Sequence, residues 1–144
     1  MTRRTVLPRS TYLVKQLERA LRTRIDALAK PFGLTAVQYT AMSVVAHHEG
    51  MSSAQLARRS FVSAQAANEL VGALERVGLI ERRMDREGGR ALGIFLTRLG
   101  WRQLARCDAA MDDLETAMFR GISRQDEARF RDTLRACCDA VREP

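Results

Sequence analysis

The order of five short segments between residues 52 and 97 constrains the fold of this chain more than any other feature. In chain order they are a helix near 53–59, a turn at 60–62, a helix near 63–77, and β-like segments at 79–84 and 91–96. The second helix stops at Gly78, and a charged tip with two glycines joins the β-like segments. Helix, turn, helix and hairpin is the order of a winged helix-turn-helix.

Glycines and capping residues mark the ends of the other helices. Four glycines follow helical patterns, as a left-handed residue does after a helix: Gly33, Gly50, Gly78 and Gly121. Capping boxes are expected at Thr35 with Gln38 and at Ser52 with Gln55. Further N-cap candidates are Ser10 or Thr11, Ser63, Thr97 and Ser123. These marks predict four more helices, near 11–30, 35–48, 97–119 and 124–141.

The predicted fold is therefore mainly α with a small β-hairpin wing. The 144 residues suit a single unit, with a winged helix-turn-helix lobe over 33–97 and a helical lobe over 10–32 and 98–144.

No apolar run approaches the roughly 18–20 residues of a membrane span, and the amino terminus has no apolar signal region. The three cysteines are an odd number and suggest no disulfide framework, so we expect a cytoplasmic protein that does not bind membranes.

Basic charge is concentrated at the start of the chain. The net charge is +7, and residues 1–30 hold eight basic and two acidic side chains, which makes +6 for that segment. Such charge attracts polyanions such as DNA and speeds encounter with them. The alternative is an arginine-rich composition without a binding role, because only two of the 24 basic residues are lysine.

The helices outside the winged segment carry apolar faces that need a partner. The first helix has a stripe of Leu13, Leu17, Leu21, Ile25 and Leu28, and the last offers Phe130, Leu134, Cys137, Cys138 and Val141. A winged domain of some 60 residues cannot bury all of these faces. We therefore expect a two-fold homodimer with these helices as its base, the alternative being a monomer folded back on itself.

The helix over 63–77 has one apolar side and one polar side. At 100° per residue, the side expected to pack is Ala67, Leu70, Val71, Leu74 and Val77, and the side expected to face out is Gln65, Asn68, Glu69, Gly72 and Arg76. Gln65 and Asn68 could each donate to and accept from adenine in a major groove. Glu69 could accept from a cytosine amino group or pair with an arginine. Ser63 and Ala64 lie at the amino end, where the helix dipole favours a phosphate. A solvated polar face is the alternative reading.

Arginines on the hairpin and on the helix before it are further candidates for contact with DNA. The hairpin carries Arg82, Arg83, Arg86 and Arg90. An arginine on a narrow hairpin can enter a minor groove, and Arg90 is the preferred candidate. These arginines could instead balance Glu81, Asp85 and Glu87. Arg58 and Arg59, at the end of the helix near 53–59, are candidates for phosphate contact.

With these residues the chain resembles the MarR family of bacterial transcription regulators over nearly its whole length. The resemblance rests on Gly33-Leu34-Thr35 with Gln38-Tyr39, on Leu56-Ala57, on the run from Leu74 to Arg82, and on Leu96-Thr97-Arg98-Leu99-Gly100. It implies a homodimer with two winged lobes on a helical dimerisation base. It also implies binding to an inverted-repeat operator in double-stranded DNA, as a repressor released by a small ligand or an oxidant.

The chain departs from the family pattern in its wing. Gly88 stands where the family usually has an aspartate, while the arginine of that motif is kept as Arg90. The usual brace between the two is therefore missing, with Asp85 as a possible substitute. The recognition helix also lacks the arginine that many relatives have near Asn68.

Family ligand pockets imply a site among the first, second and fifth helices. The candidates there are Tyr12, Tyr39, Met42 and Trp101, whose aromatic and thioether side chains suit a planar phenolic ligand. Ordinary core packing is the alternative for each. The adjacent His47 and His48 point in different directions on a helix and suit a helix end near solvent better than a metal site. We therefore expect neither a metal nor a cofactor.

The family's peroxide-sensing branch uses a cysteine near the start of the first helix, where this chain has none. Cys107, Cys137 and Cys138 are expected to be buried as small apolar residues. A redox switch would instead need an exposed thiolate of low pKa. A ligand-responsive repressor is the preferred hypothesis. The alternatives are a cysteine-based redox-responsive regulator and a winged module for protein–protein contact, the latter favoured by Gly88, Glu69 and the near-neutral charge of residues 31–144. No triad, metal-ligand cluster or phosphate loop indicates an enzyme.

Overall fold

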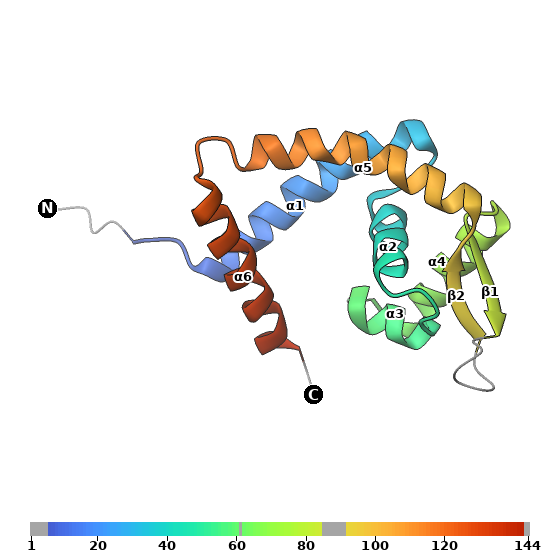
Figure 1. Ribbon diagram of the computed structural model, residues 1–144. Helices are drawn as coiled ribbons and strands as arrows, with labels where there is room; N and C mark the ends of the chain where they lie inside the picture. The colour runs from blue at the N-terminus through green and yellow to red at the C-terminus, as the bar shows by residue number, and fades with distance from the viewer. Residues whose placement is uncertain (1–5, 61, 85–91, 143–144) are drawn as a thin grey trace, which may run out of the picture. The chain divides into compact units, whose positions relative to one another are not determined.

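The computed structural model describes residues 6–60, 62–84 and 92–142, which form two compact units, 1–111 and 112–144 (Figure 1). In the first unit the helices are α1 (Ser10–Ala29), the short 3-10 helix η1 (Lys30–Phe32), α2 (Ala36–His47), α3 (Ser53–Ser60) and α4 (Ala64–Arg76). The strands β1 (Ile80–Met84) and β2 (Leu92–Leu96) follow, and α5 (Arg98–Met118) begins in this unit and ends in the second. The second unit continues with α6 (Arg124–Val141). This confirms the mainly α fold with a hairpin wing.

Side-chain caps begin most of the helices as predicted. Thr35 and Gln38 form a complete capping box, with Gln38 N donating to Thr35 Oγ1 over 3.1 Å and Thr35 N donating to Gln38 Oε1 over 3.0 Å. Ser52 and Gln55 form the second box. The hydroxyls of Ser63, Thr97 and Ser123 each accept from the backbone N–H three residues ahead.

The predicted cap of α1 is wrong. Its N-cap is Arg9, which makes no side-chain hydrogen bond, and Ser10 is already helical. The four glycine ends are confirmed, since Gly33, Gly50, Gly78 and Gly121 have φ between 74° and 85°. A residue with a Cβ adopts this left-handed region only with strain.

The core of the winged segment lies among α2, α3, α4 and the hairpin. Its largest fully buried side chains include Met42, Leu56, Leu74, Ile80 and Ile94. Val77, predicted to pack with them, is 62% exposed, and this correction has a backbone cause. Val77 is the C-cap of α4 with φ −94° and ψ 6°, so it leaves the helical path that carries Ala67, Val71 and Leu74 inward.

The wing is joined to the helix-turn-helix through backbone hydrogen bonds. β1 and β2 pair antiparallel, from Ile80 opposite Leu96 to Met84 opposite Leu92. Met51, just before α3, adds an isolated bridge to Ile94, with Ile94 N donating to Met51 O over 2.8 Å and Gly50 N donating to Ile94 O over 2.9 Å. The residues 85–91 of the wing tip lie outside the described part of the chain.

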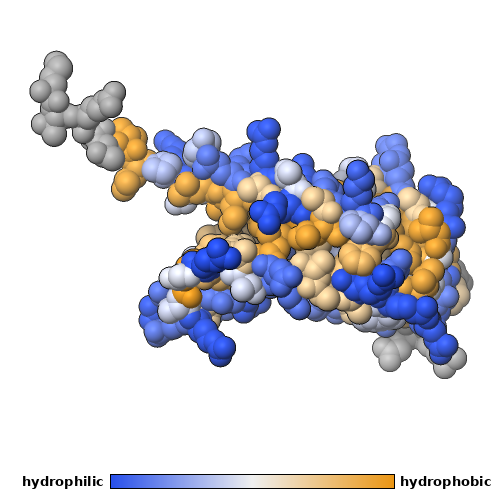
Figure 2. Space-filling model, turned by 90° about the horizontal axis from the view of Figure 1, so that it is seen from above, coloured by the Kyte–Doolittle hydropathy of each residue, from blue (hydrophilic) through white to orange (hydrophobic). Residues whose placement is uncertain are grey.

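Apolar side chains of the outer helices remain uncovered within a single chain. Ala29 is the one buried residue of α1, and the predicted stripe is half-buried except for Leu13, which is 48% exposed. α6 has no buried residue. Figure 2 shows apolar side chains at the surface, including those next to the N-terminal residues drawn in grey. Within the described ranges, no helix combines the length and apolar character needed to cross a bilayer.

Candidate nucleic-acid interface

The outward face of α4 is open to solvent. Gln65, Asn68 and Glu69 are exposed, while Ala67, Val71 and Leu74 on the opposite face have no exposed surface. A winged helix-turn-helix needs this arrangement, because only side chains that leave the domain can reach base edges in a major groove. The residues predicted to read DNA thus lie together on one accessible helix face.

Two hydrogen bonds organise the polar side chains of this face. Ser53 Oγ, at the start of α3, donates to Asn68 Oδ1 over 2.7 Å. Gln65 Nε2 donates to Glu69 Oε1 over 3.3 Å within α4. Glu69 therefore accepts from a neighbouring amide, although an arginine partner was also considered for it. Sequence reasoning missed Ser53, because no periodicity relates a residue of α3 to one fifteen positions later in α4.

The amino end of α4 presents several hydrogen-bond donors. Ser63 Oγ accepts from Ala66 N over 3.0 Å and still has its own hydroxyl proton to donate. Helix geometry leaves the N–H groups of Ala64 and Gln65 without an intrahelical acceptor. The exposed residues Ser63 and Ala64 thus lie at a helix end suited to a phosphate oxygen.

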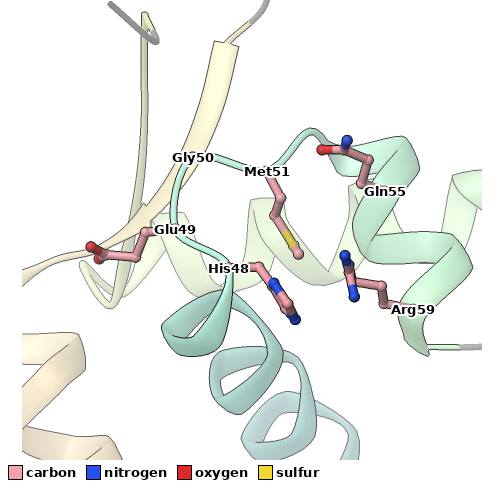
Figure 3. A pocket seen from close by; sticks show the side chains of 6 residues that line it. All are labelled: His48, Glu49, Gly50, Met51, Gln55 and Arg59. Carbon is pink, nitrogen blue, oxygen red and sulfur yellow. The ribbon is translucent and has the colours of Figure 1, made fainter. Parts of the chain in front are cut away.

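Arg58 and Arg59 are both exposed at the carboxyl end of α3. Arg59 lines an open hollow of about 270 Å³, together with His48, Glu49, Gly50, Met51 and Gln55. Figure 3 shows the side chains of His48 and Arg59 on either side of Met51, with Glu49 directed away from them. Because Arg59 is exposed, its guanidinium group can reach a phosphate from the carboxyl end of α3.

The two described wing arginines are held by their own chain. The Arg83 guanidinium carbon lies 3.9 Å from the centroid of the Phe95 ring, and Arg83 Nε lies 3.7 Å from Glu81 Oε1. Arg82 Nε lies 3.9 Å from Glu75 Oε2. These contacts fit the charge-balancing alternative for this pair. Arg86 and Arg90, the preferred groove contacts, lie outside the described residues with Asp85, Glu87 and Gly88.

Tyr39 is the most constrained of the four candidate ligand residues. Its hydroxyl donates to Asp108 Oδ1 over 2.5 Å, which links α2 to α5 within the first unit. Burial, and next the bond to the Asp108 carboxylate, raise the pKa of Tyr39 well above its usual range. Tyr39 is therefore a neutral hydrogen-bond donor at any physiological pH.

The other three candidates are dispersed. Met42 is fully buried in the core, which is the packing alternative for this residue. Trp101 is exposed on α5, and Tyr12 is exposed on α1 with its hydroxyl accepting from Gln16 Nε2 over 3.1 Å. None of the four lines the hollow beside Arg59 or the hollow between Asp112 and Glu127 in the second unit.

The three cysteines differ in their exposure, and the two histidines lie at the end of α2. Cys107 is buried, and this burial raises the pKa of its thiol, with Asp108 acting in the same direction and Arg106 against it. Cys138 is half-buried and Cys137 is exposed, so the prediction that all three are buried is wrong for Cys137, because the second unit alone buries no side chain of α6. His47 and His48 are exposed at the end of α2, as expected. No group of three or more potential metal ligands occurs in the described ranges.

Comparison with known proteins shows that this chain is similar to transcription regulators. A model described as "MarR family" matches residues 32–91. The HTH-type transcriptional repressor Rv2887 of Mycobacterium tuberculosis is 28% identical over 120 residues, which cover 83% of this chain and 86% of the relative.

Solved structures agree with this result. The Rv2887 complex with salicylic acid has a TM-score of 0.72 and 26% identity, covering 92% of this chain and 98% of that one. CouR from Rhodococcus jostii RHA1 bound to p-coumaroyl-CoA has a TM-score of 0.82 and 23% identity, covering 88% and 90%. The S. aureus MepR–DNA complex has a TM-score of 0.78 and 19% identity, covering 92% and 96%. The last two likenesses are evidence for the fold.

Proposed function

We propose that this chain is a transcriptional regulator of the MarR family, a repressor that binds an inverted repeat in double-stranded DNA as a homodimer and is released by a small aromatic acid. The proposal is supported by the match to the family model and by the similarity to a known repressor. The action of this chain is by binding rather than catalysis, and it takes place in the cytoplasm with the DNA. The observation that carries the proposal is the exposed polar face of α4, on a helix whose opposite face is fully buried.

Each part of the proposed interface has a chemical role. Gln65 and Asn68 contact base edges in the major groove, with Glu69 beside them. The N–H groups and hydroxyl at the start of α4, with Arg58 and Arg59 of α3, contact phosphates and set the register of the protein on the duplex. Arg86 and Arg90 are assigned to the minor groove on sequence grounds.

Uncovered apolar surface on the outer helices supports a homodimer. α6 buries no side chain within its own chain, and Phe130 of α6 is 37% exposed even though its ring packs edge-on against Phe119 at 5.8 Å. A second copy offers the same faces in a two-fold arrangement. Two recognition helices then contact half-sites one DNA turn apart, about 34 Å.

The proposed effector is an aromatic carboxylic acid or its thioester. The Rv2887 structures hold salicylic acid and p-aminosalicylic acid, and CouR holds p-coumaroyl-CoA. In this chain the bond between Tyr39 and Asp108 joins the winged segment to α5, so a ligand that separates α2 from α5 changes the placement of the winged lobe. Release requires only that the ligand bind the altered conformer more tightly than the DNA-bound one.

The proposal is tested by selecting bound duplexes from a random pool and measuring the affinity of the enriched sequence at several salt concentrations. Arg59→Ala is expected to lower affinity on all sequences alike and to reduce the slope of log affinity against log salt by about one, since one phosphate contact is lost. Gln65→Ala is expected to relax base preference at one position per half-site. Arg120→Ala, which removes an exposed arginine from the second unit, is the control and should change neither quantity.

Two outcomes would contradict the proposal. One is that no duplex is enriched and binding does not depend on salt, which would favour the protein–protein module. The other is an enriched duplex whose affinity is unchanged by every aromatic acid tried, salicylic acid included, which would remove the effector but leave the DNA-binding role.

A further inference from the structure

The hydrogen bond between Ser53 and Asn68 connects the two helices of the helix-turn-helix at the surface that the proposed function assigns to DNA. Ser53 is half-buried in the first turn of α3, and Asn68 is exposed in the second turn of α4. The donor is Ser53 Oγ and the acceptor is Asn68 Oδ1, 2.7 Å apart. The inference below rests on the proposed function, since it concerns how that surface reads bases.

Ser53 is held in place by the cap of its own helix. The capping box of Ser52 and Gln55 surrounds it, with bonds of 3.1 Å from Gln55 N to Ser52 Oγ and 2.9 Å from Ser52 N to Gln55 Oε1. Two buried side chains, Leu56 and Ala57, anchor the next turn of α3 in the core. The hydroxyl of Ser53 therefore occupies a defined position beside α4.

In this contact the carbonyl end of the Asn68 amide is turned toward Ser53. A free asparagine can present either its carbonyl oxygen, which accepts, or its amino group, which donates. With the oxygen turned toward Ser53, the amino group is the end left for an external partner. Gln65 differs, because its amide donates to Glu69 within the same helix, over a longer 3.3 Å.

We propose that Ser53 is a positioning residue that sets the hydrogen-bond polarity of Asn68, so that Asn68 donates to the DNA and selects bases with an acceptor at the contacted position. Guanine offers N7 and O6, adenine N7 and thymine O4, whereas cytosine presents only its amino group in the major groove. Cytosine is therefore the base that this site excludes. When the Ser53 hydroxyl is removed, the amide turns freely, its oxygen accepts from the cytosine amino group, and the exclusion is lost.

The experiment uses the full chain and four versions of the enriched duplex that differ at one position per half-site, namely the position whose preference Asn68→Ala abolishes. For the unchanged protein, cytosine there should weaken binding about 10-fold, within the range of one good base contact. Ser53→Ala should reduce this discrimination to less than about 3-fold. Ser53→Thr keeps the hydroxyl and should restore it.

Further readouts separate positioning from a general structural effect. The salt dependence of binding should be the same for the unchanged protein and Ser53→Ala, because no phosphate contact is involved. Ser53→Ala combined with Asn68→Ala should behave as Asn68→Ala alone, since the serine acts through the asparagine. Ser53→Gly removes the same hydroxyl and serves as the second variant if Ser53→Ala does not fold, with thermal unfolding measured for each.

The results distinguish this inference from the function on which it rests. Full discrimination against cytosine in both Ser53→Ala and Ser53→Gly would overturn the role of Ser53 while leaving DNA binding established. A preference of the unchanged protein for cytosine would overturn the assigned polarity. Failure of the unchanged protein to bind any duplex would overturn both the inference and the proposed function.

Discussion

Tyr39 is a single side chain whose hydroxyl joins two helices. It belongs to α2, and its hydrogen bond to Asp108 reaches α5, 69 positions later in the chain. Burial of the ring and the adjacent carboxylate both disfavour the phenolate, so the pKa of Tyr39 in the folded protein lies above that of an unfolded chain, which is about 10.

Tyr39→Phe is expected to lower the free energy of unfolding by about 1 kcal/mol near neutral pH, the usual contribution of one such hydrogen bond. Since the folded-state pKa of Tyr39 is raised, its contribution is complete below about pH 10 and is lost as pH rises through the raised value. Urea unfolding between pH 7 and 11 should therefore show a loss of stability above pH 10 in the unchanged protein that Tyr39→Phe lacks. Tyr12→Phe, whose hydroxyl bonds only within α1, is the control, and a parallel alkaline loss in all three proteins would refute the assignment.

At this scale the sequence predicts which side chains face out but not what they bind. The exposure of Gln65, Asn68 and Glu69 followed from helical periodicity alone. The partner of Asn68 did not, because Ser53 lies on another helix and the contact depends on side-chain rotamers and on the angle of the turn. Val77 was misplaced because periodicity assumes helical dihedral angles one residue beyond the last helical residue.

The junction between the wing and α5 depends on close backbone approach. Thr97 N donates to Leu79 O over 3.1 Å, and Thr97 Oγ1 donates to Gly78 O over 2.5 Å while accepting from Gly100 N. A Cβ placed on Gly100 would lie 2.1 Å from Leu79 O. The start of α5 can lie against the backbone of Leu79, just before β1, only because residue 100 has no side chain.

Gly100→Ala is expected to lower the free energy of unfolding by about 3 kcal/mol, the upper part of the range for an overpacked site, since backbone must shift to admit the methyl group. Gly72→Ala is the matched control. The nearest atom to its added Cβ is the end of the Arg76 side chain at 3.9 Å, so this change in the middle of α4 should stabilise the protein by up to about 1 kcal/mol. Thermal or denaturant unfolding measures both, and equal effects of the two substitutions would contradict the proposed close approach.

The helices and strands were predicted closely, because capping residues and glycines in the local sequence mark where they begin and end. Thr97 and Ser123 begin α5 and α6, and Gly78 follows α4, as predicted from the sequence. The bridge between Met51 and Ile94 was not predicted, since one residue in a loop carries no strand pattern. It is a consequence of the tertiary fold.

At the scale of the whole molecule, the outer helices leave apolar side chains exposed within a single chain. The sequence alone predicts that apolar surface is left over, because the apolar faces of the outer helices are more than a winged lobe of this size can bury. The pairing of those faces between copies could not, since it depends on three-dimensional complementarity rather than on periodicity along one helix.

Leu13→Asp is expected to convert the proposed dimer to a monomer at micromolar concentration. It replaces an exposed apolar side chain, which the dimer should bury, with a charged one. Binding to the inverted repeat should then weaken at least 10-fold, since the two half-sites are no longer held by one molecule. Lys15→Asp introduces the same side chain at an exposed position two residues away and should remain dimeric. Sedimentation and DNA titration measure the two effects, and a monomeric unchanged protein would rule out the dimer.

The bridge from Met51 to Ile94 has a consequence for how this molecule tolerates variation in its target. Because the hairpin is hydrogen-bonded to the segment that leads into α3, the described part of the wing and the helix-turn-helix are held together as one body. If α4 and the wing both contact DNA as proposed, we expect a promoter with one base more or fewer between the two contacts to bind less well. In the proposed dimer, adjustment would be left to the distance between the two lobes.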